Sequence, residues 1–310
     1  MSAAPVVPTP VVPTSTVPIP VVRDVPGPRA ADAVYDAVAV RSAAVVIRAY
    51  SSSFGWACRL LGGPVRDHVR TVYALVRVAD EIVDDPASGL TGAERGELLT
   101  ELEREVGRAR ERGRSSNLVV HAFARTAREF GIGDDLVTPF FGAMRADLTA
   151  TTHDDASFAA YVHGSAEVVG LMCLRVFVAG DDAAYGRLAP GAARLGAAFQ
   201  KVNFLRDLAE DQDVRGRSYF PGLDVDAFDD ADRDRLLADV DADLAAAAAV
   251  IDDLPRSSRR AVRVAHDLFA ELSRRLAATP AATIRRERVR VPDLVKARLV
   301  AAAVARDVLR

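Results

Sequence analysis

The sequence predicts an all-α fold, and three observations carry this prediction. From Ala31 onward, long stretches rich in Ala, Leu, Val, Arg, Glu and Asp recur with helical patterning. Short runs rich in Gly, Pro, Asp and Ser separate these stretches, and few segments show the alternation of a β-strand. The helices between the breaks would be roughly 15 to 30 residues long, which implies a core too large for a simple four-helix bundle.

The first 30 residues form a region of their own, rich in valine, proline and threonine. Half of the 16 prolines in the chain fall between Pro5 and Pro28. Because proline lacks the amide hydrogen and fixes φ, this stretch can be neither a helix nor a central strand. It also lacks the basic start and unbroken apolar run of a secretory signal. The sequence therefore predicts an extended or disordered tail over residues 1–30 and a single all-α domain over residues 31–310.

Within the domain, glycine and proline mark the connections between successive helices. No internal repeat with a fixed period is evident, so an array of repeats is not expected. The expected connections lie at residues 62–64, 86–89, 131–133, 180–182 and 221–222.

Composition excludes several classes of protein. The 40 Lys and Arg residues nearly balance the 43 Asp and Glu residues, which argues against a nucleic-acid binder. Two cysteines, Cys58 and Cys173, are too few for a disulfide framework and are expected to be small core residues in a reducing compartment. No uncharged apolar stretch reaches about 18 residues, so no transmembrane segment is expected. We therefore expect a cytoplasmic protein, with peripheral association at the inner face of a membrane left open.

The first informative segment runs from residue 71 to residue 85. On a helix, Asp80 and Asp84 share one face with Arg77, while most of the remaining surface is apolar. Like charges four residues apart destabilise an isolated helix by roughly 0.2–0.5 kcal/mol, and burial raises that cost unless a cation compensates. Carboxylates are suited to Mg²⁺, which commonly binds one or two of them together with substrate phosphates. An exposed acidic helix end is the alternative.

A second segment, from residue 200 to residue 211, repeats this design. Gln200, Asn203, Asp207 and Asp211 would share a helical face, with Arg206 beside them. Two helices that each carry an Asp-x-x-x-Asp pair and an arginine would suit a diphosphate held between them by Mg²⁺ and by guanidinium donors. Such sites are built from inward-facing side chains of a helical bundle.

These segments resemble the squalene/phytoene synthase family, the head-to-head prenyl transferases, over about Ala31 to Arg310. The match is closest to the bacterial phytoene synthases. Two departures are small: Ala209 replaces a frequent glycine, and Lys201 stands where a small residue is common. The motifs that carry the resemblance are Tyr50-Ser-Ser-Ser-Phe54, Arg77-Val-Ala-Asp80-Glu-Ile-Val-Asp84-Asp85, Tyr161-Val-His-Gly-Ser-Ala-Glu-Val-Val-Gly170, Gln200-Lys-Val-Asn203-Phe-Leu-Arg206-Asp207-Leu-Ala-Glu210-Asp211 and Arg215-Gly-Arg217-Ser-Tyr219-Phe-Pro221.

The resemblance implies a single isoprenoid-synthase helical bundle with a central active-site cavity. It implies condensation of two geranylgeranyl diphosphates to phytoene, a step of carotenoid biosynthesis, through a cyclopropylcarbinyl diphosphate. It implies a prenyl diphosphate as substrate and Mg²⁺, or Mn²⁺ in its place, as cofactor, whereas NADPH is not expected.

The resemblance also implies roles for individual residues, with Tyr161 as a candidate for handling the cation or the diphosphate. The implied metal ligands are Asp80, Asp84, Asp207 and Asp211. The implied substrate-binding residues are Tyr50, Ser51, Ser53, Arg77, Gln200, Asn203 and Arg206.

Competing interpretations remain at this stage. Squalene, dehydrosqualene or presqualene diphosphate synthesis from farnesyl diphosphate is the sister function, and a non-catalytic helical interaction protein is the alternative of a different class. Tyr161 could be an ordinary core tyrosine, and Lys201 could contact a phosphate or be solvated. The basic run formed by Arg285, Arg286, Arg288 and Arg290 could be a solvated face or a contact for anionic lipid.

Overall fold

A computed structural model describes residues 28–50, 53–85, 88–213 and 216–308 of the chain. The predicted tail lies outside these residues, except for its last positions, where the first helix begins. The described part contains helices and no β-strand, apart from one isolated bridge between Thr152 and Ser218, so the predicted fold class is confirmed. The elements are α1 (Pro28–Tyr50), α2 (Ser53–Arg59), α3 (Gly63–Asp84), α4 (Gly92–Arg112), α5 (Leu118–Phe130), α6 (Asp134–Ala146), α7 (Asp155–Val162), η2 (His163–Glu167), α8 (Val168–Phe177), α9 (Asp182–Arg206), α10 (Leu208–Asp213), α11 (Asp230–Ile251), α12 (Arg256–Ala277), α13 (Ala281–Ile284) and α14 (Asp293–Val308).

Local sequence signals set the helix ends. At the start of α4, the Thr91 hydroxyl accepts from the Glu94 amide, and the Glu94 carboxylate accepts from the Thr91 amide in return. The helix ends at Gly113, which adopts a left-handed conformation with φ of 79° that favours glycine. Asn117 then caps α5 by accepting from the Val119 and Val120 amides.

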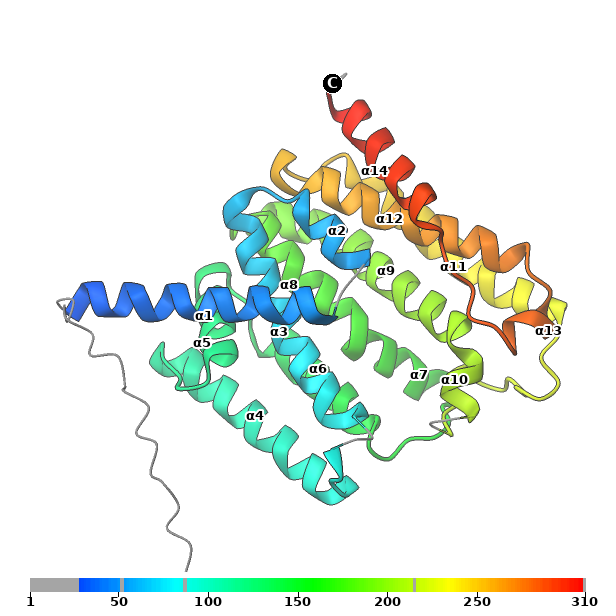
Figure 1. The fold of residues 1–310 in the computed structure, drawn as a ribbon, viewed down its shortest axis with the longest axis horizontal. Helices are drawn as coiled ribbons and strands as arrows, with labels where there is room; N and C mark the ends of the chain where they lie inside the picture. Colours follow the sequence, from blue (N-terminus) through cyan, green and yellow to red (C-terminus); the bar gives the residue numbers. More distant parts are fainter. Residues whose placement is uncertain (1–27, 51–52, 86–87, 214–215, 309–310) are drawn as a thin grey trace, which may run out of the picture.

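The bundle is arranged around one central helical segment made of α7, η2 and α8 (Figure 1). Helix α6 packs on one side of this segment and α9 on the other, while α11 and α12 cover the far side of α9. Helix α3 lies against α1, α5 and α8. The segment from Asp155 to Phe177 is long and apolar enough to cross a membrane by length and composition alone, a test that core helices of globular proteins also pass. Here it packs between other helices of the bundle.

The central segment lies unusually close to α9 because glycine faces it there. A Cβ atom placed on Gly196 would lie 2.6 Å from the carbonyl oxygen of Ala166, which belongs to the backbone of η2. That backbone cannot yield as a flexible side chain would. Close helix packing at this point therefore depends on Gly196.

Replacing Gly196 with alanine is expected to lower the free energy of unfolding by about 2 kcal/mol, because the added methyl group forces α9 away from η2. The matched control is Gly107→Ala in α4, where a Cβ would meet no atom within 4 Å. That change should stabilise the protein by up to about 1 kcal/mol through helix propensity. Urea denaturation followed by circular dichroism measures both, and equal effects of the two variants would contradict the explanation.

Helices α9 and α11 are joined by an ion-pair network with a buried centre, formed by Lys201 and Asp243. The Lys201 ammonium lies 2.5 Å from the Asp239 carboxylate and 2.8 Å from that of Asp243. Arg194 adds a contact of 2.7 Å to Asp243, whose side chain is only 1% exposed. Lys201 is itself buried. The expectation that Lys201 is solvated was therefore wrong. Its ammonium points into the α9–α11 interface, which argues against the alternative role as a phosphate contact.

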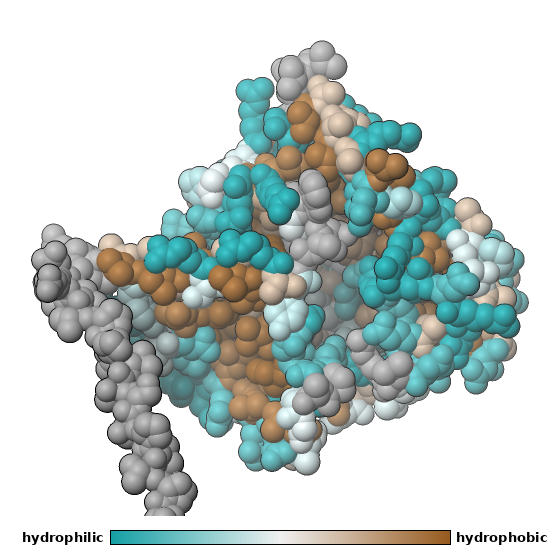
Figure 2. All heavy atoms as spheres, viewed as in Figure 1, coloured by the Kyte–Doolittle hydropathy of each residue, from teal (hydrophilic) through white to brown (hydrophobic). Residues whose placement is uncertain are grey.

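On the outer surface, polar side chains dominate the face shown in Figure 2, and apolar side chains gather along α1. Val34 and Val45 of this helix are 53% and 56% exposed.

Candidate functional site

The first acidic pair occupies the C-terminal half of α3, where the predicted helical face is realised. The Arg77 guanidinium pairs with Glu81 and lies 4.0 Å from the Asp80 carboxylate. Arg95 of α4 donates to the carbonyl oxygens of Val83 and Asp85, at 3.1 and 2.7 Å, and so fixes the end of this helix. Asp80 and Asp84 are about one-third exposed, so the pair is neither on the open surface nor sealed in the core.

A third carboxylate, Asp147, joins the pair from the residue that follows α6. Its side chain is only 6% exposed, and it accepts a hydrogen bond of 2.6 Å from the Tyr161 hydroxyl. Tyr161 lies at the end of α7 and is itself buried. This tyrosine therefore has a polar partner within the acidic cluster.

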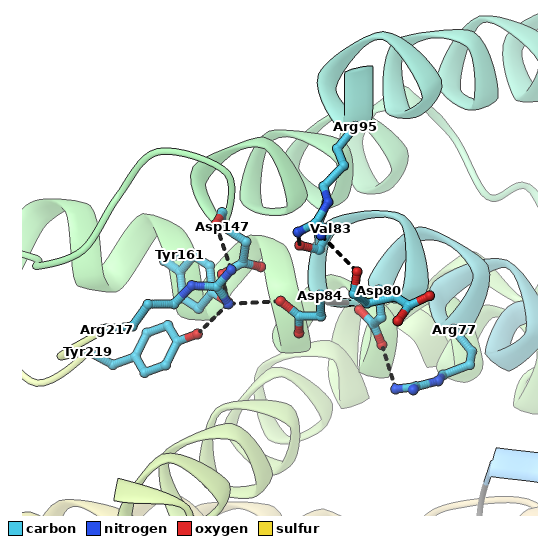
Figure 3. Close-up of polar contacts among 10 residues, drawn as sticks. Arg77, Asp80, Val83, Asp84, Arg95, Asp147, Tyr161, Arg217 and Tyr219 are labelled. Atoms are coloured by element: carbon cyan, nitrogen blue, oxygen red, sulfur yellow. Dashed lines mark hydrogen bonds and ion pairs between the residues drawn. The ribbon is translucent and has the colours of Figure 1, made fainter. Parts of the chain in front are cut away.

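Arg217 connects Asp84 of α3 with Asp147, which follows α6 (Figure 3). Its guanidinium contacts Asp84 at 2.9 Å, the Asp147 carboxylate at 3.6 Å and the Asp147 carbonyl oxygen at 2.7 Å. It also lies 3.3 Å from the Tyr219 hydroxyl. We call Asp80, Asp84, Asp147 and Arg217 the acidic cluster.

Electrostatics within the acidic cluster leave excess negative charge. Burial raises the pKa of Asp80 to about 7, and the neighbouring Asp84, Asp147 and Glu81 carboxylates raise it further against the lowering effect of Arg77. The pKa of Asp147 is raised to about 6, again chiefly by burial, although the Tyr161 hydrogen bond and Arg217 oppose the shift. The two guanidinium groups of Arg77 and Arg217 cannot balance the four carboxylates of Asp80, Glu81, Asp84 and Asp147, so the cluster favours a proton or a further cation.

Aromatic rings line the side of the cluster that faces α9. The rings of Phe204 and Tyr219 stack with centroids 4.0 Å apart, and those of Tyr161 and Tyr219 with centroids 5.3 Å apart. His153 stacks on Tyr219 at 5.9 Å. The negative faces of such rings attract nearby positive charge.

The second acidic pair is placed differently from the first. Helix α9 ends at Arg206, and Asp207 stands between α9 and α10, so the expected continuous helix is bent at this point. The i to i−4 hydrogen bonds continue on both sides, from the Asp207 amide to Asn203 and from the Asp211 amide to Asp207, each at 2.9 Å. The backbone hydrogen bonding of a helix therefore continues through the bend.

Asp211 and Asp207 lie in different surroundings. Asp211 is buried, and its carbonyl oxygen accepts from the Arg217 amide at 2.9 Å, which brings it beside the acidic cluster. Asp207 is paired with Arg206 and with Arg288, whose Nε lies 2.9 Å from the carboxylate. The two motifs thus meet at the segment from Arg217 to Tyr219.

The basic run before α14 is only partly a solvated face. Arg285 forms two hydrogen bonds with Asp213, at 2.7 and 2.8 Å, and Arg288 pairs with Asp207. Opposite charge draws this segment across α10, which the sequence expectation missed. Arg206, Arg288 and Lys296 line a groove of about 490 Å³ between α12 and this segment.

The remaining predicted residues fall near the site or outside the described part. The Arg77 guanidinium lies over the Tyr50 ring at 4.5 Å, so Tyr50 does reach the first motif. Gln200 and Asn203 lie on the last turns of α9, both partly exposed. Ser51 lies outside the described residues, and Ser53 begins α2 while its side chain is also outside the description.

An apolar cavity of about 210 Å³ extends between α3, η2, α8, α9, α11 and α12. Its wall includes Val76, one turn before Asp80, and Ser165, one turn after Tyr161, so this part of the cavity lies about one helical turn from Asp80 and from Tyr161. Cys58 and Cys173 line the wall as well, and burial raises the pKa of each thiol to about 12. As expected, both cysteines behave as small apolar groups.

The implied magnesium ion requires oxygen ligands, which the carboxylates of the acidic cluster can supply. Among the described ranges, no group of three or more carboxylate, imidazole or thiol side chains is arranged to hold a metal by itself. Mg²⁺ usually binds one or two carboxylates and completes its shell with waters and substrate phosphates. The uncompensated negative charge at Asp80 and Asp84 fits that requirement, so the residues suit the ion.

Sequence reasoning missed the roles of Asp147 and Arg217. Asp147 has no second carboxylate four residues away, so it produces no acidic stripe. Arg217 belongs to a motif that the resemblance includes, but its partners come from α3 and from the end of α6. Only the packing of these elements shows that the two residues belong to the site.

Fold and site together define a class: an all-α protein whose apolar cavity lies near a cluster of carboxylates and arginines. The sequence model of the squalene/phytoene synthase family matches residues 47–294, and the chain belongs to this family. Its members are prenyltransferases, so the chain is an enzyme of head-to-head prenyl transfer that acts on a prenyl diphosphate.

Individual relatives agree with this assignment. The chain is 28% identical over 284 residues to a phytoene synthase of Mycobacterium bovis, covering 85% of this chain and 89% of that protein. It is 31% identical over 181 residues to a 15-cis-phytoene synthase of Enterobacter agglomerans, covering 55% of this chain and 58% of that protein.

A solved structure supports the fold. A crystallised dehydrosqualene synthase superposes with a TM-score of 0.73 at 19% identity, covering 87% of this chain and 96% of that one. The isoprenoid-synthase fold expected from the sequence is thereby confirmed.

Proposed function

We propose that this enzyme condenses two geranylgeranyl diphosphates to phytoene. The observation that carries the proposal is the position of the acidic cluster near an apolar cavity. A divalent cation held by these carboxylates would bind an anionic head, and the cavity would take its long hydrocarbon chain. The names of the relatives in Mycobacterium bovis and Enterobacter agglomerans support phytoene as the product. Head-to-head joining of two such chains would release two diphosphates.

Mg²⁺ would be held by Asp80, Asp84, Asp207 and Asp211, with Mn²⁺ as a substitute. When bound, the ion supplies Lewis acidity that stabilises negative charge on the leaving diphosphate. Arg77 and Arg206 would donate charge-assisted hydrogen bonds to phosphate oxygens, as guanidinium groups do with their fixed geometry. Tyr50, Gln200 and Asn203 would complete the head-group site, together with the segment containing Ser51 and Ser53.

In the proposed reaction, the first diphosphate leaves and C1 of that chain attacks the double bond of the second. Loss of a proton gives a cyclopropylcarbinyl diphosphate. The second diphosphate then leaves, the skeleton rearranges and a final deprotonation gives the 1,1′-linked product. The apolar wall keeps water from the cations, and Tyr161, held by Asp147, would face them with its ring.

The product of purified enzyme tests this proposal. The full chain is incubated with Mg²⁺ and either geranylgeranyl or farnesyl diphosphate, with and without NADPH, and the hydrocarbons are identified by mass spectrometry. A C40 hydrocarbon formed without NADPH is expected. A C30 hydrocarbon in preference would instead favour the second candidate, dehydrosqualene synthesis, which the 26% identity to a 4,4'-diapophytoene synthase of Staphylococcus haemolyticus keeps open. Squalene would appear among the same hydrocarbons, whereas presqualene diphosphate would be identified by mass spectrometry of the diphosphate fraction.

Metal binding should depend on pH because a proton competes with the ion at Asp80. With a pKa of about 7, this carboxyl is mostly protonated at pH 6 and mostly ionised at pH 8. The affinity for Mn²⁺ is therefore expected to rise about fivefold between pH 6 and pH 7 and to level off above pH 8. Electron paramagnetic resonance of free Mn²⁺ measures this directly. An affinity for Mn²⁺ that does not change with pH would contradict the role of Asp80 as a metal ligand.

A further inference from the structure

Helix α14 is apolar on two opposite sides, and only one of them is covered by the described residues. Val295, Leu299 and Val300 pack against the hydrophobic core on the side where α12 lies. A helix that is apolar all round is usually buried. The other side is a stripe of exposed positions spaced by three or four residues, of which four are apolar and one is basic. We call this stripe the α14 face: Leu294, Ala297, Arg298, Ala301 and Ala305.

The α14 face is open to solvent along its length. Leu294, at its start, is 87% exposed, which is the highest value among the large apolar side chains of the described residues. The C-terminal turns of α14 project beyond the other helices (Figure 1). A contiguous apolar surface of this kind marks a contact with another protein or with a membrane.

The charges beside the α14 face are mostly positive. Residues 286–306 contain six Lys or Arg and only two Asp or Glu, although the whole chain has 40 of the former and 43 of the latter. Arg285 and Arg288 are held by carboxylates of the α10 region. Arg290 and Arg298, by contrast, are exposed and have no ion-pair partner among the described residues. Positive charge is therefore available next to an exposed apolar stripe.

This combination selects one occupant for the surface. Helices that lie in the interface of an anionic membrane place apolar side chains among the acyl chains and basic side chains at the lipid phosphates. A second copy docked on the same face would bring two surfaces of like net charge together. We propose that the α14 face docks on a bilayer containing anionic lipid, with Leu294 inserted and with Arg290 and Arg298 at the phosphates.

A groove beside the α14 face adjoins the apolar cavity. The lining of this groove includes Leu268 and Phe269 of α12 as well as Arg290. Phe199 lines the cavity, and its ring stacks on that of Phe269 with centroids 3.8 Å apart. One aromatic pair thus separates the two spaces, and a hydrocarbon product that passed it would emerge beside Arg290. This last step rests on the proposed function, whereas the bilayer contact rests on the surface alone.

Sedimentation of the full chain with lipid vesicles, without substrate, tests the docking surface. The protein is expected to pellet with vesicles of phosphatidylglycerol and phosphatidylcholine, to stay in solution with phosphatidylcholine alone, and to bind less as salt is raised. A basic residue at an anionic surface contributes about fivefold in affinity, so Arg290→Gln combined with Arg298→Gln should weaken binding by about 25-fold. Leu294→Ser should weaken it by about tenfold because an inserted apolar side chain is lost.

The matched control is Arg104→Gln combined with Arg108→Gln on α4. Both arginines are exposed, and α4 lies away from α14 (Figure 1), so the control removes the same charge from another surface. Its affinity for the anionic vesicles should stay within about twofold of the wild type. Because every substituted side chain is exposed, thermal denaturation should give the Tm of the wild type for all variants.

The docking surface is overturned if the wild type binds both kinds of vesicle equally, if it binds neither, or if the two double variants lose the same affinity. It is also overturned if light scattering shows a dimer that Leu294→Ser abolishes, which would assign the α14 face to a second copy. Failure of the proposed function is a separate result. A chain that forms phytoene but binds no vesicle keeps the function and loses the docking surface, and a chain that binds anionic vesicles but converts no prenyl diphosphate does the reverse.

Discussion

Replacing Asp80 with asparagine is expected to lower the rate of diphosphate release by about a thousandfold, which corresponds to about 4 kcal/mol of transition-state stabilisation. Asp80 carries the most perturbed carboxyl of the acidic cluster, and its charge would help to hold the metal. Because the change also removes a repulsive negative charge, helix content and Tm should be unchanged or higher. Product formation at saturating Mg²⁺ and circular dichroism check the two expectations.

The control for this variant is Asp67→Asn at the other end of the same helix. Asp67 pairs with Arg70, and its side chain is 48% exposed, so its loss should leave activity within about twofold. Activity close to that of the wild type in Asp80→Asn would contradict the assignment of Asp80 as a ligand. It would then favour a role for this motif in packing alone.

Replacing Lys201 with methionine is expected to lower the free energy of unfolding by about 3 kcal/mol. The change leaves Asp243, 1% exposed, without its buried partner, and breaking one half of a buried ion pair typically costs about 3–5 kcal/mol. The lower end applies because Arg194 still contacts Asp243. The pKa of Lys201 is raised by its two carboxylates against the lowering effect of burial, so the contribution should persist until strongly alkaline pH.

Two companions test this explanation by urea denaturation. Lys296→Met removes a lysine whose partner Asp293 is 96% exposed, so the loss should be less than about 0.5 kcal/mol. The double variant Lys201→Met with Asp243→Leu replaces the whole pair with apolar groups and should recover much of the stability. Below the unfolding temperature, Lys201→Met should retain kcat. A loss of kcat in a fully folded variant would restore the phosphate role that the structure argues against.

The helical nature of the chain and the first acidic motif could be predicted because both depend on residues close in sequence. Asp80 and Asp84 are four residues apart, so one helix is enough to place them on one face. The sequence left a buried pair and an exposed acidic helix end as alternatives, and the structure lies between them, with both side chains about one-third exposed. Their roles as ligands stay a prediction until metal binding is measured.

The surroundings of the second motif could not be predicted from residue spacing along a helix. Spacing placed Asp207 on the same helical face as Gln200, but no local signal indicated the bend at Asp207 that separates α9 from α10. Spacing could not show that Arg288, 81 residues further on, pairs with Asp207. Nor could it show that Lys201 points to α11 instead of toward the site, because α11 lies about 40 residues away in sequence.

By itself, then, the sequence determined the all-α fold, the family and the acidic stripe on α3, since helix periodicity and motif spacing are local properties. Tertiary structure alone decided that Asp147 and Arg217 complete the acidic cluster. It also decided that the Lys201 ammonium points into the interface between α9 and α11. The physical reason is that pKa shifts, ion pairs and cavity walls depend on distances through space, and these are set when separate helices pack together.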